Sequence, residues 1–347
     1  MCYNVIALSS KSALHSKGSE DLVKQGFIPK SEFNSKKMNQ DLILVLFLIM
    51  GWRIVYIEES DYLSLYLDNL KIKRESNDLL MPLSDIHTLI IDNYKSILSI
   101  PLINKCSEYN VNLIICNISH LPQAIMSPIS GKNQAPIVFK NQLKWDENKK
   151  MIIHKNIVIN KIINQAQVLI KNKKNQDVIN KLLKFSNEVQ NGDATNREGL
   201  SAKIYFRELF GKEFTRFADD TVNSALNYGY SIMRSQISKV LIAKGLNTSL
   251  GIFHRGSENE FNLSDDIIEV FRPIIDDYVY KNIIGKNFLE REDRLNLIKL
   301  TTNNFRYKNE KHTFLNAMSL YITMIIDYFN ESEVDEFVAP KFNDYGI

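Results

Sequence analysis

The sequence contains few cysteines and few histidines, and their spacing excludes the common zinc sites. Its 347 residues include three cysteines (Cys2, Cys106 and Cys116), which form neither a metal-binding pair nor the dense pattern of a disulfide scaffold. Of its six histidines, no two are four residues apart, as they are in the His-x-x-x-His pair of zinc proteases. We therefore expect a reducing, cytoplasmic location and no zinc site of these types.

The sequence also lacks a long hydrophobic segment and a strong net charge. Its longest apolar run, residues 42–50, is too short to span a bilayer, which takes about 20 residues. This run also lies too far from Met1 for a standard signal peptide, so no membrane partner is expected. At a net charge of +3, a nucleic-acid partner would have to bind to local basic patches.

The length and the periodicity of the chain are those of an α+β protein with two domains. We predict a small β-rich N-terminal domain at residues 50–130 and a larger all-α catalytic domain at residues 131–347. Residues 1–49 are rich in Ser, Lys and Asn and have weak periodicity, which predicts a poorly ordered extension. Because the regular pattern begins at Met50, we expect the native chain to start there and the extension not to be native.

Strand signals dominate the predicted N-terminal domain. Its short β-branched and aromatic runs are bounded by charged or turn-forming residues, as in strands. One helix is predicted at residues 97–109, where Pro101 is tolerable only in the first turn. The predicted strands are residues 53–58, 62–67, 70–73, 89–91 and 112–116.

Helical periodicity replaces the strand pattern after residue 136. Gly211 and Gly245 follow two of the predicted helices, at the position where glycine often ends a helix. The predicted helices are residues 137–171, 178–189, 195–210, 221–244 and 264–282, with two or three more within 283–304 and 312–329.

Glu198 is the first candidate for a functional residue. A capping box formed by Thr195 and Glu198 would explain it without any function. However, Glu198 is also in line with Tyr205 and Leu209 at helical spacing, on the apolar face of its predicted helix. A carboxylate on a buried face needs a partner, and this favours a functional interpretation.

His254 is the second candidate. It follows an apolar segment and precedes a loop that contains Gly256, so its imidazole is expected at the end of an element, where functional sites are common. A lone histidine is more often a surface residue or a hydrogen-bonded residue than a ligand.

The third candidate is the acidic group Asp265, Asp266 and Glu269. If Ser264 caps a helix, these acids lie within one turn of each other, and Asp265 and Asp266 suit a helix N-terminus. Glu269 lies beyond the first turn, so the helix dipole does not explain it. Pro273 removes the hydrogen bond to the carbonyl of Glu269, which predicts a kink there.

One imidazole and several carboxylates together suit a divalent ion such as Mg²⁺ or Mn²⁺ better than a thiolate zinc site. Such ions serve phosphoryl transfer. Basic residues beside the acids would suit an anionic substrate, although a solvated helix face is the commoner explanation for each one alone. These basic residues are Arg197, Lys203, Arg207, Arg255 and Arg272.

Residues 50–347 resemble the CRISPR-associated Cas1 family of spacer-acquisition integrases, most closely its type II branch. No single motif is specific for this family, but the order and spacing of all the motifs together are specific for it. The motifs are residues 50–53 (MGWR), 196–199 (NREG), 201–206 (SAKIYF), Asn223, 228–230 (YGY), His254, 261–269 (FNLSDDIIE) and 271–273 (FRP). Residues 1–49 match nothing in the family.

The resemblance implies that Glu198, His254 and Glu269 are catalytic ligands of Mg²⁺ or Mn²⁺, with Asp266 in a supporting role. It also implies a homodimer that assembles with the small protein Cas2 and acts on double-stranded DNA, both prespacer and CRISPR repeat. The implied reaction is attack of a DNA 3′-hydroxyl on a repeat phosphodiester, and in type II systems further adaptation proteins take part. We expect Arg197, Lys203, Arg255 and Arg272 to contact DNA.

Two alternatives to an integrase remain at this stage. The same site would make a metal-dependent endonuclease if water were the nucleophile, because the two activities differ only in the nucleophile that is held in line. A non-catalytic DNA-binding scaffold of the same fold is the other alternative. The presence of all three candidate ligands argues against the scaffold.

Overall fold

The computed structural model describes residues 4–8, 53–59, 62–73, 78–126, 135–330 and 337–346. The chain divides into two compact units, Met1–Pro128 and Ile129–Ile347. The first is rich in strands and the second in helices, so the predicted α+β class is confirmed. The predicted domain boundaries and the apolar run at residues 42–50 lie outside the described residues.

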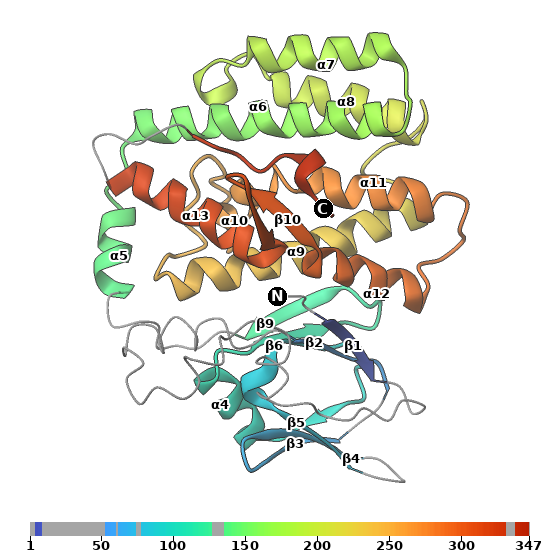
Figure 1. Cartoon of the computed structure of the whole chain (residues 1–347), viewed down its shortest axis with the longest axis vertical. Coiled ribbons are helices and arrows are strands. Elements are labelled where there is room, and N and C mark those ends of the chain that lie inside the picture. Colours follow the sequence, from blue (N-terminus) through green and yellow to red (C-terminus); the bar gives the residue numbers. More distant parts are fainter. Residues whose placement is uncertain are drawn as a thin grey trace. The chain divides into compact units, whose positions relative to one another are not determined.

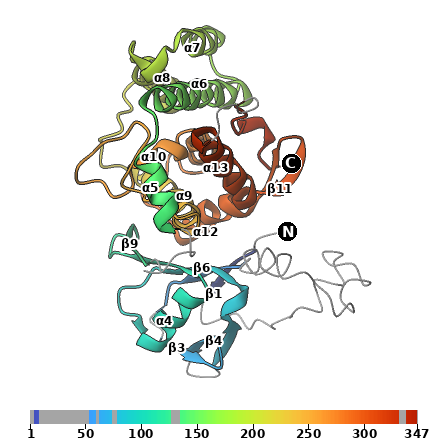
Figure 2. The same cartoon turned by 90° about the vertical axis from the view of Figure 1, so that its left-hand side faces the viewer.

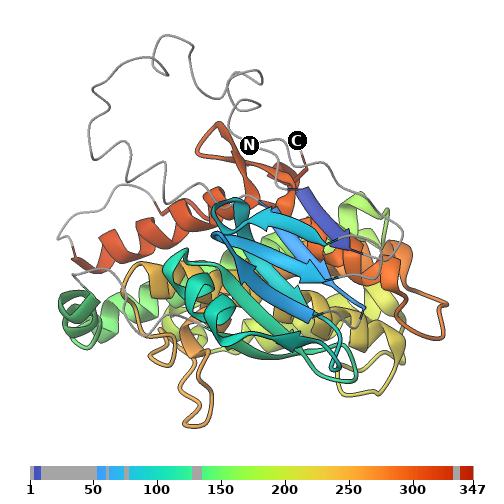
Figure 3. The same ribbon diagram turned by 90° about the horizontal axis from the view of Figure 1, so that it is seen from below.

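The described strands of the N-terminal unit form two sheets, whose strands are coloured from blue to green in Figure 3. The larger sheet contains, in spatial order, β1 (Asn4–Leu8), β2 (Arg53–Ile57), β6 (Ile86–Ile91), β8 (Asn112–Cys116) and β9 (Pro122–Met126). Its strands are parallel except for β9. The smaller sheet contains β5 (Leu79–Pro82), β4 (Asn69–Lys73), β3 (Tyr62–Tyr66) and β7 (Ile97–Leu98).

A single apolar core joins the two sheets of this unit. Val55 and Leu89 from the larger sheet pack with Leu63 and Ile72 from the smaller one. Helix α4 (Ile100–Glu108) adds Leu102 to the same core. Burial of these side chains supplies the main stabilising free energy of the unit.

Most of the predicted strands are present, and one local difference has a clear cause. Residues 97–98 form strand β7 and not the start of the helix, because Ser99 donates its backbone N–H to the carbonyl of Leu63 at 2.9 Å and ties this segment to the sheet. Helix α4 therefore begins at Ile100, with Pro101 in its first turn as predicted. Cys106 and Cys116 are both buried.

Strand β1 falls within the extension for which poor order was predicted. It pairs in parallel with β2, Asn4 opposite Arg53 and Leu8 opposite Ile57. The prediction of poor order is therefore wrong for residues 4–8, where a short β-branched and apolar run adds an edge strand to a buried neighbour. The rest of the extension lies outside the described residues.

The helical unit has two groups of packed helices (Figures 1 and 2). Helices α6 (Glu147–Lys171), α7 (Gln176–Glu188) and α8 (Arg197–Phe210) pack against one another. Helix α9 (Thr221–Ala243) packs against α10 (Asn262–Ile268), α11 (Arg272–Asn282), α12 (Arg291–Lys299) and α13 (Phe314–Asn330). Helix α6 also contacts α10 and α11, so it joins the two groups.

The long helix predicted at residues 137–171 is two helices, α5 (Ala135–Gln142) and α6. Between them, Trp145 stacks on Phe329 with ring centroids 4.0 Å apart. Asp146 then caps α6, because its side chain accepts the backbone N–H of Lys149 at 2.9 Å. A tertiary contact and a capping residue thus end one helix and begin the next.

The helix predicted at residues 264–282 is also two helices, α10 and α11, so the kink predicted at Glu269 is a complete break. Pro273 lies in the first turn of α11, where its missing N–H costs nothing. Ser264 does not cap a helix. Its hydroxyl is buried within α10 and lies 2.9 Å from the hydroxyl of Ser238.

The unit predicted to be all-α also contains a hairpin of β10 (Asn304–Tyr307) and β11 (Glu310–Thr313). Its two-residue turn, Lys308 and Asn309, has positive φ angles of 50° and 65°, the conformation of a type I′ turn. Across the described residues, no helix is both long and apolar enough to cross a membrane.

Candidate active site

Helix α8 presents Glu198 in its first turn. Asn196 is the N-cap, and the carboxylate of Asp193 accepts the backbone N–H of Glu198 at 2.9 Å. The capping box of Thr195 and Glu198, the alternative suggested by the sequence, is therefore wrong. Because other residues cap the helix, the carboxylate of Glu198 is available for contacts elsewhere.

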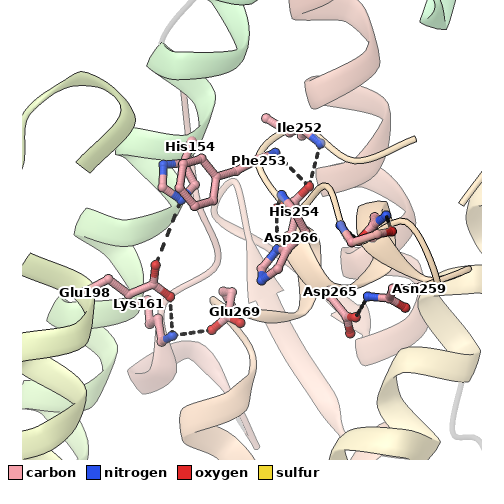
Figure 4. A network of polar contacts seen from close by, with 12 residues as sticks. His154, Lys161, Glu198, Ile252, Phe253, His254, Asn259, Asp265, Asp266 and Glu269 are labelled. Atoms are coloured by element: carbon pink, nitrogen blue, oxygen red, sulfur yellow. Dashed lines mark hydrogen bonds and ion pairs between the residues drawn. The ribbon is translucent and has the colours of Figure 1, made fainter. Parts of the chain in front are cut away.

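The carboxylates of Glu198 and Glu269 meet at the ammonium group of Lys161, on α6 (Figure 4). The Lys161 Nζ lies 2.6 Å from Glu198 Oε1 and forms an ion pair with Glu269 Oε2. Because both oxygens contact one nitrogen, they lie within about 6 Å of each other. Lys161 is only 8% exposed and Glu269 only 5%, so this cluster is buried.

The charges of this cluster stabilise one another. Burial opposes the charge of Lys161, but the carboxylates of Glu269 and Glu198 outweigh it and raise its pKa. The charge of Lys161 in turn lowers the pKa of Glu198 against the opposing effect of burial. Lys161 and Glu198 are therefore both charged at neutral pH.

Asp266 holds His254 and the loop before it. Its carboxylate accepts the backbone N–H groups of Ile252, Phe253 and His254 at 2.5, 3.1 and 3.1 Å (Figure 4). It also lies 2.7 Å from Nδ1 of His254, and this hydrogen bond is the main reason that the pKa of His254 is raised. Within the described residues, no hydrogen bond is made by Nε2, so this nitrogen remains available to a ligand.

Gly251 allows this loop to close over Asp266. A Cβ atom at this position would lie 2.2 Å from the carbonyl oxygen of His254 and 2.9 Å from Asp266 Oδ2. Only glycine leaves room for both groups. The sequence therefore fixes the position of His254 through one small residue and one buried acid.

The sequence analysis missed two residues of this cluster, His154 and Lys161, which both lie on α6. The imidazole of His154 stacks on Phe253 with ring centroids 3.6 Å apart, and its Nε2 lies 3.9 Å from Glu198 Oε2. Burial lowers the pKa of His154. The one available signal was the presence of a histidine and a lysine on the apolar helix face that contains Ile157.

The other acids of this region have different surroundings. Asp265 accepts a hydrogen bond from the Asn259 side chain at 2.8 Å and lies 3.7 Å from Arg234. Glu258 and Glu260 are exposed in the preceding loop. None of these three carboxylates contacts Lys161 or His254 in the described structure.

The four basic residues predicted to contact DNA differ in how they are engaged. Arg272 pairs with Glu269 at 3.1 Å and lies over the ring of Tyr230, so it belongs to the buried cluster. Arg197 pairs with Glu188 at 3.0 Å. The remaining two, Lys203 and Arg255, are exposed, and Arg255 pairs with Glu147.

A cleft of about 600 Å³ adjoins His254. Residues 254–260 line one part of it, and Trp145, Glu147 and Lys150 line another. The cleft leaves open space beside the imidazole, whereas Lys161 and Glu269 are buried.

The donor set of Glu198, Glu269 and His254 suits a hard divalent cation, because it offers carboxylate oxygens and one imidazole nitrogen. As the side chains stand, the described residues contain no group of three or more His, Cys, Asp or Glu side chains placed to hold a metal ion. The two carboxylates converge on an ammonium group instead. A positive charge is thus already stabilised at the point where the sequence predicted a cation.

The fold and the site define a class: an α+β protein whose helical unit brings two carboxylates, an imidazole and a buried ammonium group together. Solved structures share the fold. A Cas1 protein from Thermotoga maritima has a TM-score of 0.66 at 17% identity, over 83% of this chain and 100% of its own. A casposase bound to integration product has a TM-score of 0.65 at 19% identity, over 81% of this chain and 92% of its own.

Residues 54–306 match the family model described as CRISPR associated protein Cas1, and the chain belongs to this family. The CRISPR-associated endonuclease Cas1 of Neisseria meningitidis serogroup C is 36% identical over 228 residues, which cover 65% of this chain and 74% of that protein. A Cas1 protein of Methanobrevibacter ruminantium is 27% identical over 216 residues, covering 54% of this chain and 64% of that protein. The resemblance predicted from the sequence motifs is confirmed.

Proposed function

We propose that this protein is a metal-dependent DNA integrase of CRISPR adaptation, which joins the 3′-hydroxyls of prespacer DNA to phosphodiesters of the CRISPR repeat. The same site would give it nuclease activity on DNA. Family membership supports this proposal, as does the name endonuclease given to the Neisseria meningitidis relative. The observation that carries it is the convergence of Glu198 and Glu269 on one buried cation, beside a His254 that Asp266 holds in place.

In this proposal, Glu198, His254 and Glu269 hold Mg²⁺ or Mn²⁺. The ion would supply polarisation of the phosphodiester and a lower pKa for the attacking hydroxyl. Asp266 fixes the tautomer and the orientation of His254, because its carboxylate occupies Nδ1 and leaves Nε2 for the ion. The loop N–H groups bound to Asp266 keep this carboxylate from turning away.

Contacts to DNA phosphates would come from Arg197, Lys203, Arg255 and Arg272. Lys203 is exposed and needs no rearrangement to meet a phosphate, whereas the exposed Arg255 would have to exchange Glu147 for it. Arg197 and Arg272 would have to exchange Glu188 and Glu269 for a phosphate. We also propose a cytoplasmic location, where such DNA is found.

The proposed partners are a second copy of the chain, Cas2 and, as in the type II branch, further adaptation proteins. In a solved Cas6-RT-Cas1–Cas2 complex, part of one chain has the same fold, with a TM-score of 0.65 at 18% identity over 81% of this chain and 35% of that chain. This likeness is one of fold, and the fold is its only support for an assembly with Cas2.

The proposal is tested by joining a labelled duplex with 3′-hydroxyls to a plasmid that carries the repeat, with Cas2 and Mn²⁺. We expect joined product from the wild type and a loss of about 100-fold or more in Glu198→Ala and Glu269→Ala, since each removes a ligand. Glu260→Ala is the matched control, because it removes an exposed carboxylate from a neighbouring loop. Undiminished joining by Glu198→Ala would contradict the proposal.

The same assay separates the integrase from the two alternatives. A duplex that ends in 3′-deoxynucleotides cannot attack, so the integrase should give no joined product with it. Cleavage of the plasmid without joining would indicate an endonuclease that uses water. Binding of DNA with neither reaction would indicate a non-catalytic scaffold.

A further inference from the structure

Lys161 has an unusual position for a lysine. It lies on the buried face of α6, and its side chain is 10% exposed. Its ammonium group contacts Glu198 from α8 and Glu269 from the junction between α10 and α11. One cation thus connects the two carboxylates of the proposed metal site.

The charges around Lys161 are balanced. The carboxylates of Glu198 and Glu269 face two cations, Lys161 and Arg272. A divalent ion that joined this group with both cations in place would leave a buried surplus of two positive charges. Such a surplus is costly where Lys161 and Glu269 are buried.

The position of a bound ion would also conflict with that of the Lys161 ammonium group. A metal ion held by both carboxylates needs their oxygens at about 2.0–2.2 Å, and those oxygens now contact the Lys161 nitrogen. Two cations cannot occupy one point between the same pair of oxygens. The ammonium group and a divalent ion therefore compete for Glu198 Oε1 and Glu269 Oε2.

We infer that Lys161 is a positioning residue that holds Glu198 and Glu269 together in the metal-free protein and leaves them when a divalent ion binds. This inference rests on the proposed function, because it takes these carboxylates to be metal ligands. It adds that the protein carries its own competitor, which keeps the empty site folded and weakens its affinity for the ion. A fixed structural ion pair would behave differently, because its loss would weaken metal binding.

The test compares the full-length wild type with Lys161→Met and Lys161→Arg. In EDTA, Lys161→Met should lower the Tm by about 5–10 °C, because the buried carboxylate of Glu269 and the partly buried carboxylate of Glu198 lose their shared partner. Calorimetric titration with MnCl₂ should give this variant a Kd about tenfold lower than the wild type, because no ammonium has to be displaced. Mn²⁺ should also raise its Tm by more than that of the wild type.

Lys161→Arg should change the Kd for Mn²⁺ in the opposite direction, so it still tests the inference if Lys161→Met does not fold. A guanidinium binds a carboxylate more strongly than an ammonium does, through two parallel hydrogen bonds. This variant should therefore bind Mn²⁺ several-fold more weakly than the wild type. Lys281→Met is the matched control, because Lys281 pairs with Asp277 at 2.7 Å outside the cluster, and it should have the wild-type Kd.

A Kd for Mn²⁺ that is unchanged or higher in Lys161→Met would overturn the inference and make Lys161 a structural residue. The proposed function would survive that result if the wild type binds Mn²⁺ and Glu198→Ala does not. If the wild type itself shows no binding that depends on Glu198, the proposed metal site fails, and the inference fails with it.

Discussion

At the scale of single residues, Asp266 holds both the loop before His254 and the imidazole of His254 itself. One carboxylate, 1% exposed, receives N–H groups from three consecutive residues of the loop and the imidazole of His254. A buried carboxylate with this many donors is stable only while every donor stays in place. The position of His254 therefore depends on a residue that the proposed ion would not touch.

We predict that Asp266→Asn destabilises the protein and weakens the metal site. The amide keeps the size of the side chain but replaces one acceptor oxygen with an N–H₂ group, which faces N–H donors of the loop. The free energy of unfolding should fall by about 1–3 kcal/mol. The Kd for Mn²⁺ should rise about 10- to 100-fold, as measured by calorimetry.

Asp265→Asn is the control for this prediction. It makes the same chemical change one residue earlier, where the carboxylate contacts Asn259 and Arg234. This variant should keep the wild-type Kd. Equal effects of the two substitutions would show that charge in the region matters and that the hydrogen bonds of Asp266 do not.

At the scale of helices, Asp276 connects three of them. It lies on α11 and accepts hydrogen bonds from Tyr205 of α8, at 3.0 Å, and from Tyr230 of α9. Gly229 allows this approach, because a Cβ there would lie 2.6 Å from Ile275 Cγ2 on α11. The same helices carry Glu198 and Arg272, so their spacing also sets the geometry of the site.

This connection predicts a pH dependence of stability. Burial raises the pKa of Asp276 to about 6 from 3.8, although the two tyrosine hydroxyls oppose the shift. Above pH 6 the carboxyl group is ionised in both states, and its burial cost is fully present. As the pH falls from 6 towards 3.8, the folded state takes up a proton that the unfolded state does not, so stability rises.

Between pH 7.5 and 5.0, Asp276 should add about 1–2 kcal/mol to the free energy of unfolding, and Asp276→Asn should remove this gain. Urea unfolding followed by the fluorescence of Trp145, in a Trp52→Phe background, reports on the helical unit. Asp277→Asn is the control, since that carboxylate pairs with Lys281, and it should keep the wild-type pH dependence. The assignment of this pH dependence to Asp276 would be refuted if the free energy of unfolding changed with pH in the same way in the wild type and in Asp276→Asn.

At the scale of the whole molecule, the site belongs entirely to one unit. Lys161, Glu198, His254, Asp266 and Glu269 all lie within Ile129–Ile347. The polar contacts described for these residues are with residues of the same unit. We therefore expect the proposed metal site to require no residue of the N-terminal unit.

We predict that residues 129–347, expressed alone, bind Mn²⁺ with a Kd within about threefold of the full chain, a free-energy difference below about 1 kcal/mol. Circular dichroism establishes that the fragment is helical, and calorimetry gives the Kd. Glu198→Ala in the same fragment should abolish binding. A helical fragment without Mn²⁺ binding would show that the N-terminal unit supports the site.

The sequence predicted most helices and strands, because hydrophobic periodicity depends only on residues that are close together in the chain. Strands β2 and β8 and helix α9 lie close to their predicted ranges. The errors fall where tertiary contacts decide, as at Trp145, whose stacking on Phe329 separates α5 from α6. The hairpin β10–β11 was missed for the same reason, because the buried Phe305 packs against the rings of Phe271 and Phe314, and the buried Tyr307 contacts Met324.

The sequence by itself determined the class of the protein and its family, because ordered motifs with fixed spacing persist whatever the side chains contact. It also singled out Glu198, His254 and Glu269 as candidate ligands, an assignment that stays a prediction. Only the tertiary structure decided what surrounds them: the ammonium group of Lys161 between the carboxylates, and His154 beside Glu198. The physical reason is that periodicity shows which face of a helix is buried, whereas the packing of separate helices selects the charges that meet there.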